Sequence, residues 1–123
     1  MHILYIEEND HFREVVSHSL IRAGYSLVSA KSVDELPIVL SKEGKTIGSF
    51  DVIITDDHLG DGKTGTDLAK NLRSRNYKGK IILYAGHAYA ESSLRSKDFD
   101  EGFDKKNPFR ALLTYLESLD LRQ

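Results

Sequence analysis

Two short apolar runs in this sequence each end in a pair of acidic residues. The run Ile3–Ile6 leads into Glu7–Glu8, and the run Val52–Thr55 leads into Asp56–Asp57. Short, uninterrupted apolar runs are typical of strands that are buried on both faces of a parallel sheet. Parallel strands end at the same edge of the sheet, and ligands of open α/β sheets bind along that carboxyl edge. The sequence therefore predicts a carboxylate cluster there, which favours a hard divalent cation because unneutralised carboxylates repel each other.

Strand-like and helix-like segments alternate along the chain, five of each. The strands are expected at residues 2–7, 25–30, 51–56, 80–85 and 101–105. The third should be central and buried, and the fifth short, polar and at an edge. This order predicts a doubly wound α/β domain: a five-stranded parallel sheet with helices on both faces and right-handed crossovers. We expect one such domain over residues 1–123, with no output domain attached.

The helical segments carry apolar residues at 3.6-residue spacing, which assigns their buried faces. The expected core residues of three helices are Phe12, Val15, Val16, Leu20, Ala23, Leu68, Ala69, Leu72, Phe109, Leu112, Leu113, Leu116 and Leu119. The second helix has two candidate starts. It begins either at a capping box of Ser32 and Glu35 or beside Pro37, and it ends near Gly44. Residues 88–97 have only weak helical character.

Composition excludes several classes of function. The formal net charge is −2 and the chain has no cysteine, so it lacks both a strong field toward nucleic acid and the means for disulfides or thiolate metal sites. The basic residues near the end of the third helix fit a solvated helix end, and no DNA-reading element accompanies them. No apolar run reaches the ~20 residues that span a bilayer, and no signal peptide is visible. We therefore expect a cytoplasmic protein that contacts neither nucleic acid nor membrane.

Four motifs together give the sequence its resemblance to a known family. They are Ile6–Arg13, Asp51–Gly60 followed by Thr64–Gly65, Ile81–Ala88, and Phe103–Phe109. In this order and at nearly this spacing, they resemble the receiver domain of two-component response regulators over almost the whole chain. The resemblance implies a flavodoxin-like receiver topology.

The resemblance also implies roles for individual residues. Asp56 matches the family's phosphoacceptor aspartate, and Lys106 its charge partner, first for Asp56 and later for the phosphoryl group. A Mg²⁺ ion would be held by Glu8, Asp56 and the main-chain carbonyl of His58, with Glu7 acting through a metal-bound water. The chain would then catalyse at most its own phosphorylation and dephosphorylation and would not otherwise be an enzyme.

Three departures from the family pattern bear on this chemistry. Ala85 stands where the family has a threonine or serine, so a hydroxyl donor to the phosphoryl group is missing and coupling to the switch aromatic Phe103 is weakened. Glu8 replaces the usual aspartate, which shifts one predicted metal ligand. Asn107 lies between Lys106 and the following proline, where the family pattern has no residue.

Partners of such a domain are proteins. A histidine kinase or phosphotransfer protein would supply the phosphoryl group, and a downstream protein target would bind on the side of Tyr84, Phe99 and Phe103. An alternative is a degenerate receiver, or pseudo-receiver, that binds protein partners without phosphorylation, which the three departures favour. A small enzyme on a similar sheet is disfavoured, because Glu7–Glu8 would repel the phosphate group of a flavodoxin-like cofactor.

Overall fold

A computed structural model describes residues 1–86 and 96–121 of the chain. The predicted 88–97 segment therefore lies largely outside the described residues. All five predicted strands are present. In chain order the elements are β1 (His2–Ile6), α1 (Asp10–Arg22), β2 (Ser26–Ala30), α2 (Leu36–Glu43), the 3₁₀ helix η1 (Ile47–Ser49), β3 (Val52–Thr55), α3 (Gly65–Ser74), β4 (Lys80–Ala85), β5 (Glu101–Asp104) and α5 (Arg110–Leu121).

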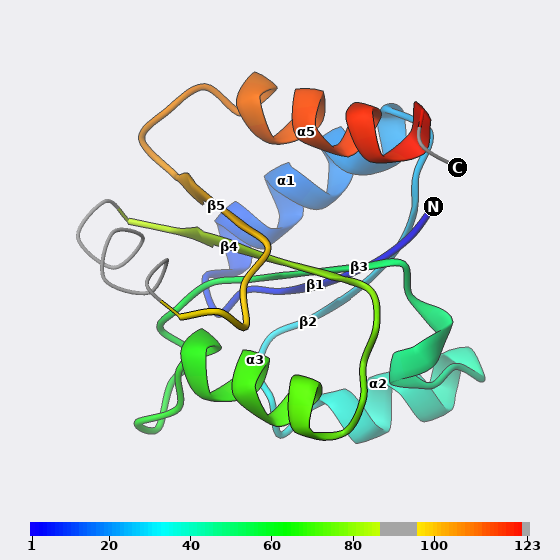
Figure 1. The fold of residues 1–123 in the computed structure, drawn as a ribbon, viewed down its shortest axis with the longest axis vertical. Coiled ribbons are helices and arrows are strands. Elements are labelled where there is room, and N and C mark those ends of the chain that lie inside the picture. The colour runs from blue at the N-terminus through cyan, green and yellow to red at the C-terminus, as the bar shows by residue number, and fades with distance from the viewer. Residues whose placement is uncertain (87–95, 122–123) are drawn as a thin grey trace.

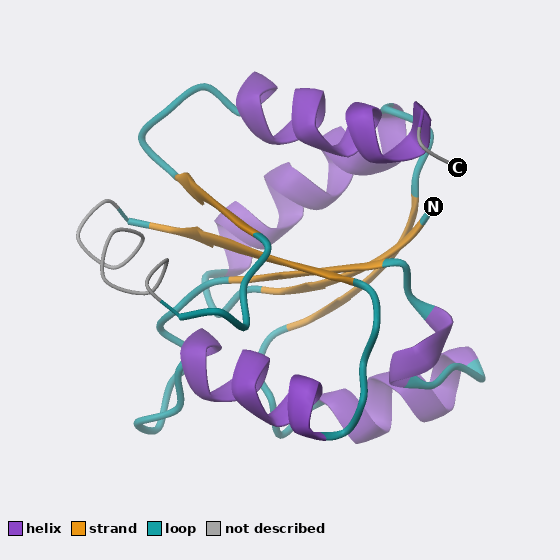
Figure 2. Ribbon diagram, viewed as in Figure 1, coloured by secondary structure: helices purple, strands orange, loops and turns teal. Residues whose placement is uncertain are grey.

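The strands form one parallel sheet in the order β2-β1-β3-β4-β5. Figure 1 shows α1 and α5 covering one face of this sheet and α2 and α3 covering the other, and Figure 2 shows the same layers by element type. The predicted doubly wound architecture is confirmed. The central place of β3 and the edge place of β5 are confirmed as well.

Alternating side chains of the strands divide the core into two halves. Leu4, Ile53 and Leu83 pack toward α2 and α3, whereas Tyr5 and Ile54 pack toward α1 and α5. Side chains of successive strand residues point to opposite faces of the sheet, so each strand contributes to both halves. Fully covered strands of this kind explain the uninterrupted apolar runs that the sequence displays.

Helix boundaries follow local signals. Asn9 caps α1, because its side-chain oxygen accepts a hydrogen bond from the main-chain nitrogen of Phe12 at 2.8 Å. The helix α2 starts beside Pro37, the second of the two candidate starts, and its C-cap Gly44 has a left-handed φ of 64°. Two predicted core residues are wrong: Val15 is 50% exposed on the outer side of α1, and Ala23, the C-cap of that helix, is exposed too.

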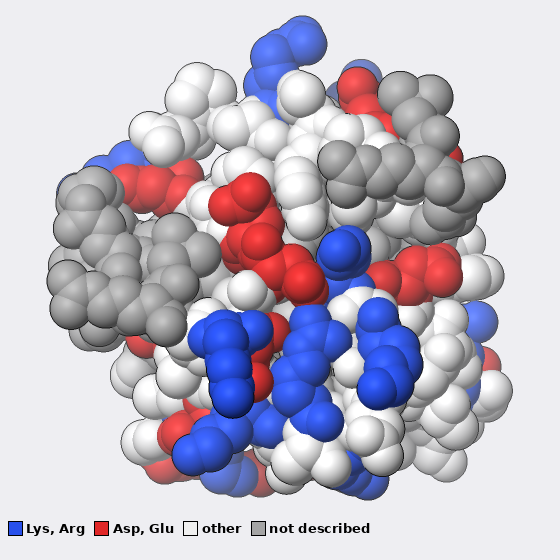
Figure 3. Space-filling view, viewed as in Figure 1, with Lys and Arg blue, Asp and Glu red and all other residues white. Residues whose placement is uncertain are grey.

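Charged side chains fix the turn that precedes β5. Arg73 of α3 pairs with Asp100 at 2.6 Å and donates a hydrogen bond to the main-chain oxygen of Asp98 at 3.2 Å. Asp100 also accepts a hydrogen bond from the main-chain nitrogen of Ile81 at 2.8 Å. Figure 3 shows the acidic residues of this region beside the basic residues that gather over α3. The turn is thereby tied to α3 and β4, which fixes the start of β5.

Among the residues that the structure describes, none belongs to a helix that is both long and apolar enough to cross a membrane.

Candidate functional site

The ends of β1 and β3 bring two of the predicted acidic residues together. The two strands are neighbours with Ile6 opposite Thr55, and the main-chain nitrogen of Asp56 donates to the Ile6 oxygen at 3.1 Å. Glu7 and Asp56 therefore leave adjacent strands at the same edge, as the sequence predicts.

Lys105 lies between these two carboxylates. Its Nζ is 2.5 Å from Glu7 Oε1 and 2.8 Å from Asp56 Oδ2. The chain reaches this position because the Lys105 main-chain nitrogen donates to the Ala85 oxygen at 2.9 Å, directly after β5. The ammonium group also lies over the Phe12 ring, 4.6 Å from its centroid. One cation thus serves both acids, at the edge where ligands of this sheet type bind.

Glu7 is the buried member of the cluster. Its side chain is 1% exposed, and Oε2 accepts a hydrogen bond from the main-chain nitrogen of Asn9 at 3.1 Å. Burial raises the pKa of Glu7 above its usual value and the nearby Asp56 charge adds to the rise, whereas Lys105 lowers it. The lysine is therefore the main counter-charge that Glu7 meets inside the protein.

The neighbouring acid Asp57 has a different role from Asp56. Asp57 Oδ1 accepts hydrogen bonds from the Thr66 hydroxyl at 3.0 Å and the Thr66 main-chain nitrogen at 3.3 Å. It is buried and holds the first turn of α3 against the end of β3. The helix approaches so closely that a Cβ on Gly65 would lie 2.2 Å from the Asp56 main-chain oxygen. Of the two acids, Asp56 is the one whose carboxylate faces Lys105.

The third predicted acid, Glu8, lies beside His58 and Gly60. Its Oε2 lies 3.4 Å from His58 Nε2, and its carboxyl group borders Gly60. No group of three or more acidic or histidine side chains that could hold a metal gathers anywhere in the described residues. The predicted Mg²⁺ ligands Glu7, Glu8 and Asp56 therefore do not converge here, and the donor set does not fit the ion as it stands.

The predicted charge partner Lys106 is wrong. Lys106 is exposed, and its main-chain nitrogen donates to Asp104 Oδ1 at 2.8 Å. Lys105 takes the place beside Asp56 instead. Asn107 continues this turn, with its main-chain nitrogen 3.0 Å from the Asp104 oxygen, so two residues separate the paired lysine from Pro108.

The structure places the two predicted switch residues, Ala85 and Phe103, on opposite faces of the sheet. Ala85 lies in the core half toward α2 and α3, whereas Phe103 packs with the other half, its ring centroid 5.7 Å from that of Tyr115. Successive strand residues face opposite sides, so an error of one residue exchanges the two faces. A switch aromatic would have to lie on the same face as Ala85. In β5 the residue next to Phe103 that lies on that face is Gly102.

The predicted docking side of Tyr84, Phe99 and Phe103 does not form one exposed surface. Tyr84 and Phe99 are buried, and they belong to opposite halves of the core. Tyr84 instead links the rings of Phe12 and Phe109, with centroid distances of 5.6 and 6.5 Å. The rings of Phe12, Tyr84 and Phe109 therefore form a row of contacts from beneath Lys105 to the start of α5.

Sequence reasoning missed Lys105 and the ring beneath it. All four residues of β5 are half-buried, so the strand has no apolar pattern that fixes its register and distinguishes Lys105 from Lys106. The contact with Phe12 depends on how α1 packs and has no sequence signal.

Comparison with solved structures finds receiver domains. The Thermotoga maritima response regulator TrrA, solved in complex with Mg²⁺-BeF, has 24% identity and a TM-score of 0.78 over 96% of this chain and 97% of that chain. The BeF₃-activated N-terminal receiver domain of Klebsiella pneumoniae RstA has 24% identity and a TM-score of 0.78, with 100% of both chains covered. Chemotaxis response regulator CheY4 of Vibrio cholerae has 26% identity and a TM-score of 0.74 over 95% of this chain and 96% of that chain.

No protein-family model matches the sequence, and no curated protein matches it. The similarity to receiver domains therefore rests on the comparison of structures and not on a match of sequences. It confirms the expected fold: this chain has the five-stranded, doubly wound architecture of response regulator receiver domains.

Proposed function

We propose that this chain, which has the receiver fold, is a signalling domain that accepts a phosphoryl group on Asp56. The observation that carries the proposal is the contact of 2.8 Å between Asp56 Oδ2 and Lys105 Nζ at the carboxyl edge of the sheet. The proposed donor is a phosphohistidine of a histidine kinase or phosphotransfer protein, and the signal is read by a protein partner.

The proposed transfer uses the Asp56 carboxylate as its nucleophile. One carboxylate oxygen attacks phosphorus while the bond from phosphorus to the donor nitrogen breaks, and the electron pair of that bond leaves with the imidazole. The product is an acyl phosphate. Lys105 contributes positive charge, because phosphoryl transfer depends on positioning and on neutralising the phosphoryl oxygens. The Asp56 side chain keeps 15% of its surface exposed, which gives a donor access from solvent.

We expect Mg²⁺ to bind this site weakly. The ion demands near-octahedral oxygen ligands, yet Glu7 and Asp56 are already paired with Lys105, and the Glu8 carboxylate lies 3.4 Å from His58 Nε2. Binding would require these carboxylates to exchange their present partners. A Mg²⁺ titration followed by amide shifts near Glu8 and Asp56 measures the affinity, and saturation at micromolar Mg²⁺ would contradict this expectation.

A second candidate function is that of a pseudo-receiver, which binds a protein partner without being phosphorylated. Ala85 favours it, because this fully buried residue offers no hydroxyl where the family has a donor to the phosphoryl group. The placement of Phe103 on the opposite face from Ala85 favours it too. An aromatic on that face cannot respond directly to an occupant beside Ala85.

Phosphorylation from a small donor separates the two candidates. The protein is incubated with phosphoramidate or acetyl phosphate, with and without Mg²⁺, and its intact mass is followed. An acyl phosphate appears as one added phosphoryl group that hydroxylamine removes. The variant Asp56→Asn removes the nucleophile. Asp61→Asn is the matched control, since Asp61 is an exposed loop acid whose left-handed φ of 50° asparagine tolerates.

An adduct in the wild type and in Asp61→Asn, but not in Asp56→Asn, supports the phosphoacceptor function. Persistence of the adduct in Asp56→Asn rejects Asp56 as the site. A folded wild-type protein that gains no adduct with either donor rejects the first candidate and leaves the pseudo-receiver as the better account.

A further inference from the structure

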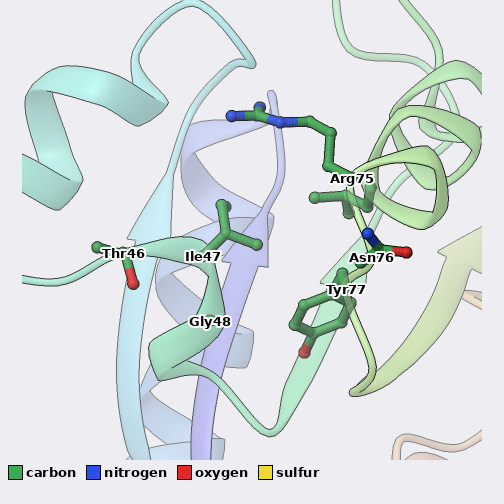
Figure 4. Close-up of a pocket in the computed structure, with 7 residues that line it drawn as sticks. Thr46, Ile47, Gly48, Arg75, Asn76 and Tyr77 are labelled. Carbon is green, nitrogen blue, oxygen red and sulfur yellow. The ribbon is translucent and has the colours of Figure 1, made fainter.

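A hollow in the surface lies at the C-terminal end of α3, the end opposite to Asp56. The hollow has a volume of about 270 Å³ and opens between η1 and the residues that follow α3. Its apolar lining comes from Ile47, Leu72 and Tyr77. Figure 4 shows these elements around the hollow, with the Arg75 side chain reaching from the end of α3 toward the segment that carries Ile47.

The floor of this hollow is held in place by buried interactions. The Tyr77 hydroxyl donates to the Phe50 main-chain oxygen at 2.9 Å, which ties the residues after α3 to the residue after η1. Arg73 donates to the main-chain oxygens of Tyr77 and Gly79, both at 2.9 Å. A Cβ at Gly79 would lie 2.2 Å from the Tyr77 hydroxyl oxygen, so the ring packs directly on the glycine. The apolar floor is therefore formed before any ligand arrives, which lowers the entropy cost of binding.

The rim of the hollow is polar and carries one cation. Thr46, Arg75 and Asn76 line it and are all exposed. Arg73 is engaged by Asp100, but no carboxylate of the described residues forms an ion pair with Arg75. Its guanidinium is thus available to an anion, and the planar fork of arginine matches a carboxylate in two parallel hydrogen bonds.

We propose that this hollow binds a small carboxylic acid with an apolar body, whose carboxylate pairs with Arg75. The volume is at the lower end for small-molecule sites, which limits the ligand to about the size of one aromatic ring with its substituent. A single cation over an apolar floor of Ile47, Leu72 and Tyr77 suits one negative charge and not a polyphosphate. The Thr46 hydroxyl and the Asn76 amide supply further donors at the rim.

Benzoate tests the proposal, with benzamide as its uncharged isostere. Each is titrated into the ¹⁵N-labelled full chain, and amide shifts are recorded. We expect saturable shifts at Ile47, Leu72 and Tyr77 with benzoate, and about fivefold weaker binding of benzamide, the most that an exposed ion pair usually contributes. Arg75→Gln should weaken benzoate binding by the same factor.

The matched control is Lys78→Gln, which removes an exposed cation outside the lining and should leave benzoate affinity unchanged. Equal binding of benzoate and benzamide to the wild type would overturn the proposal without any variant. An Arg75→Gln protein that binds benzoate as the wild type does, or the absence of saturable shifts around Tyr77, would overturn it as well. None of these results depends on whether Asp56 accepts a phosphoryl group.

Discussion

Replacing Lys105 by methionine tests whether its ammonium is the counter-charge that stabilises the acidic site. Lys105 Nζ lies 2.5 Å from Glu7 Oε1 and 2.8 Å from Asp56 Oδ2, and the Glu7 side chain is almost fully buried. Removing one partner of a buried ion pair costs about 3–5 kcal/mol of unfolding free energy. Lys105 and Asp56 keep 21% and 15% exposure, so solvent screens part of the pairing. We therefore expect a loss of about 3 kcal/mol.

Urea denaturation measures this loss. With a slope of about 2 kcal/mol per molar urea, the unfolding midpoint of Lys105→Met should fall by roughly 1.5 M. The control Lys106→Met removes the exposed neighbouring lysine and should stay within about 0.5 kcal/mol of the wild type. Adding Glu7→Gln to Lys105→Met removes the buried carboxylate that has lost its lysine, so the double variant should recover much of the lost unfolding free energy.

The loss of unfolding free energy in Lys105→Met also depends on pH, and the titration of Glu7 determines the direction of that dependence. Burial raises the pKa of Glu7 above its ordinary value of 4.5, and Lys105 opposes that rise, so removing the lysine raises the pKa further. A carboxyl group with a raised folded-state pKa contributes stability below its unfolded pKa and loses it as the pH rises through the folded value. The deficit of Lys105→Met should therefore shrink as the pH falls from about 8 to about 5. A deficit that is equal at both pH values, or equal to that of Lys106→Met, refutes the counter-charge role.

Three further substitutions have defined outcomes. Gly65→Ala places a methyl group 2.2 Å from the Asp56 main-chain oxygen, so urea unfolding should show a loss of at least ~2 kcal/mol. Ala85→Ser restores a hydroxyl at the end of β4, and a time course of intact mass should show adduct formation about tenfold faster. Tyr77→Phe leaves the Phe50 oxygen without its hydroxyl donor, which should cost about 1–2 kcal/mol in the same unfolding assay.

Each of these predictions has a clear contrary result. Gly86→Ala is the control for Gly65→Ala, because a Cβ at Gly86 meets no atom of the described residues within 4 Å, and equal losses in the two would show that the contact with Asp56 is relaxed cheaply. An unchanged rate in Ala85→Ser would show that a hydroxyl at this place does not reach the phosphoryl group. An unchanged midpoint in Tyr77→Phe would show that the hydrogen bond to Phe50 contributes nothing net.

The fold was predictable because its signals are local. Uninterrupted apolar runs identify β1, β3 and β4, which are buried on both faces, and acidic residues directly after Ile6 and Thr55 identify the edge at which they end. Once these strands are neighbours, the proximity of Glu7 and Asp56 follows from topology alone.

The remainder of the site depends on contacts that the sequence does not encode locally. The register of β5 is set by pairing with β4, not by any alternation of its own half-buried residues, so the place of Lys106 before Pro108 does not reveal that Lys105 is the lysine beside Asp56. The direction of Glu8 depends on where the loop after β3 carries His58 and Gly60. A longer side chain has more rotamers to choose from, so tertiary contacts decide where its charge lies.

The ring of Phe12 beneath Lys105 connects the charge at Asp56 to the packing of the helices α1 and α5. Lys105 lies 4.6 Å from the Phe12 centroid, and Phe12, Tyr84 and Phe109 form successive ring contacts that reach the base of α5. If the ammonium follows new negative charge at Asp56, Phe12 loses a cation that attracts its π-face. The layer in which such a change would begin is the one formed by α1 and α5, where these three rings lie.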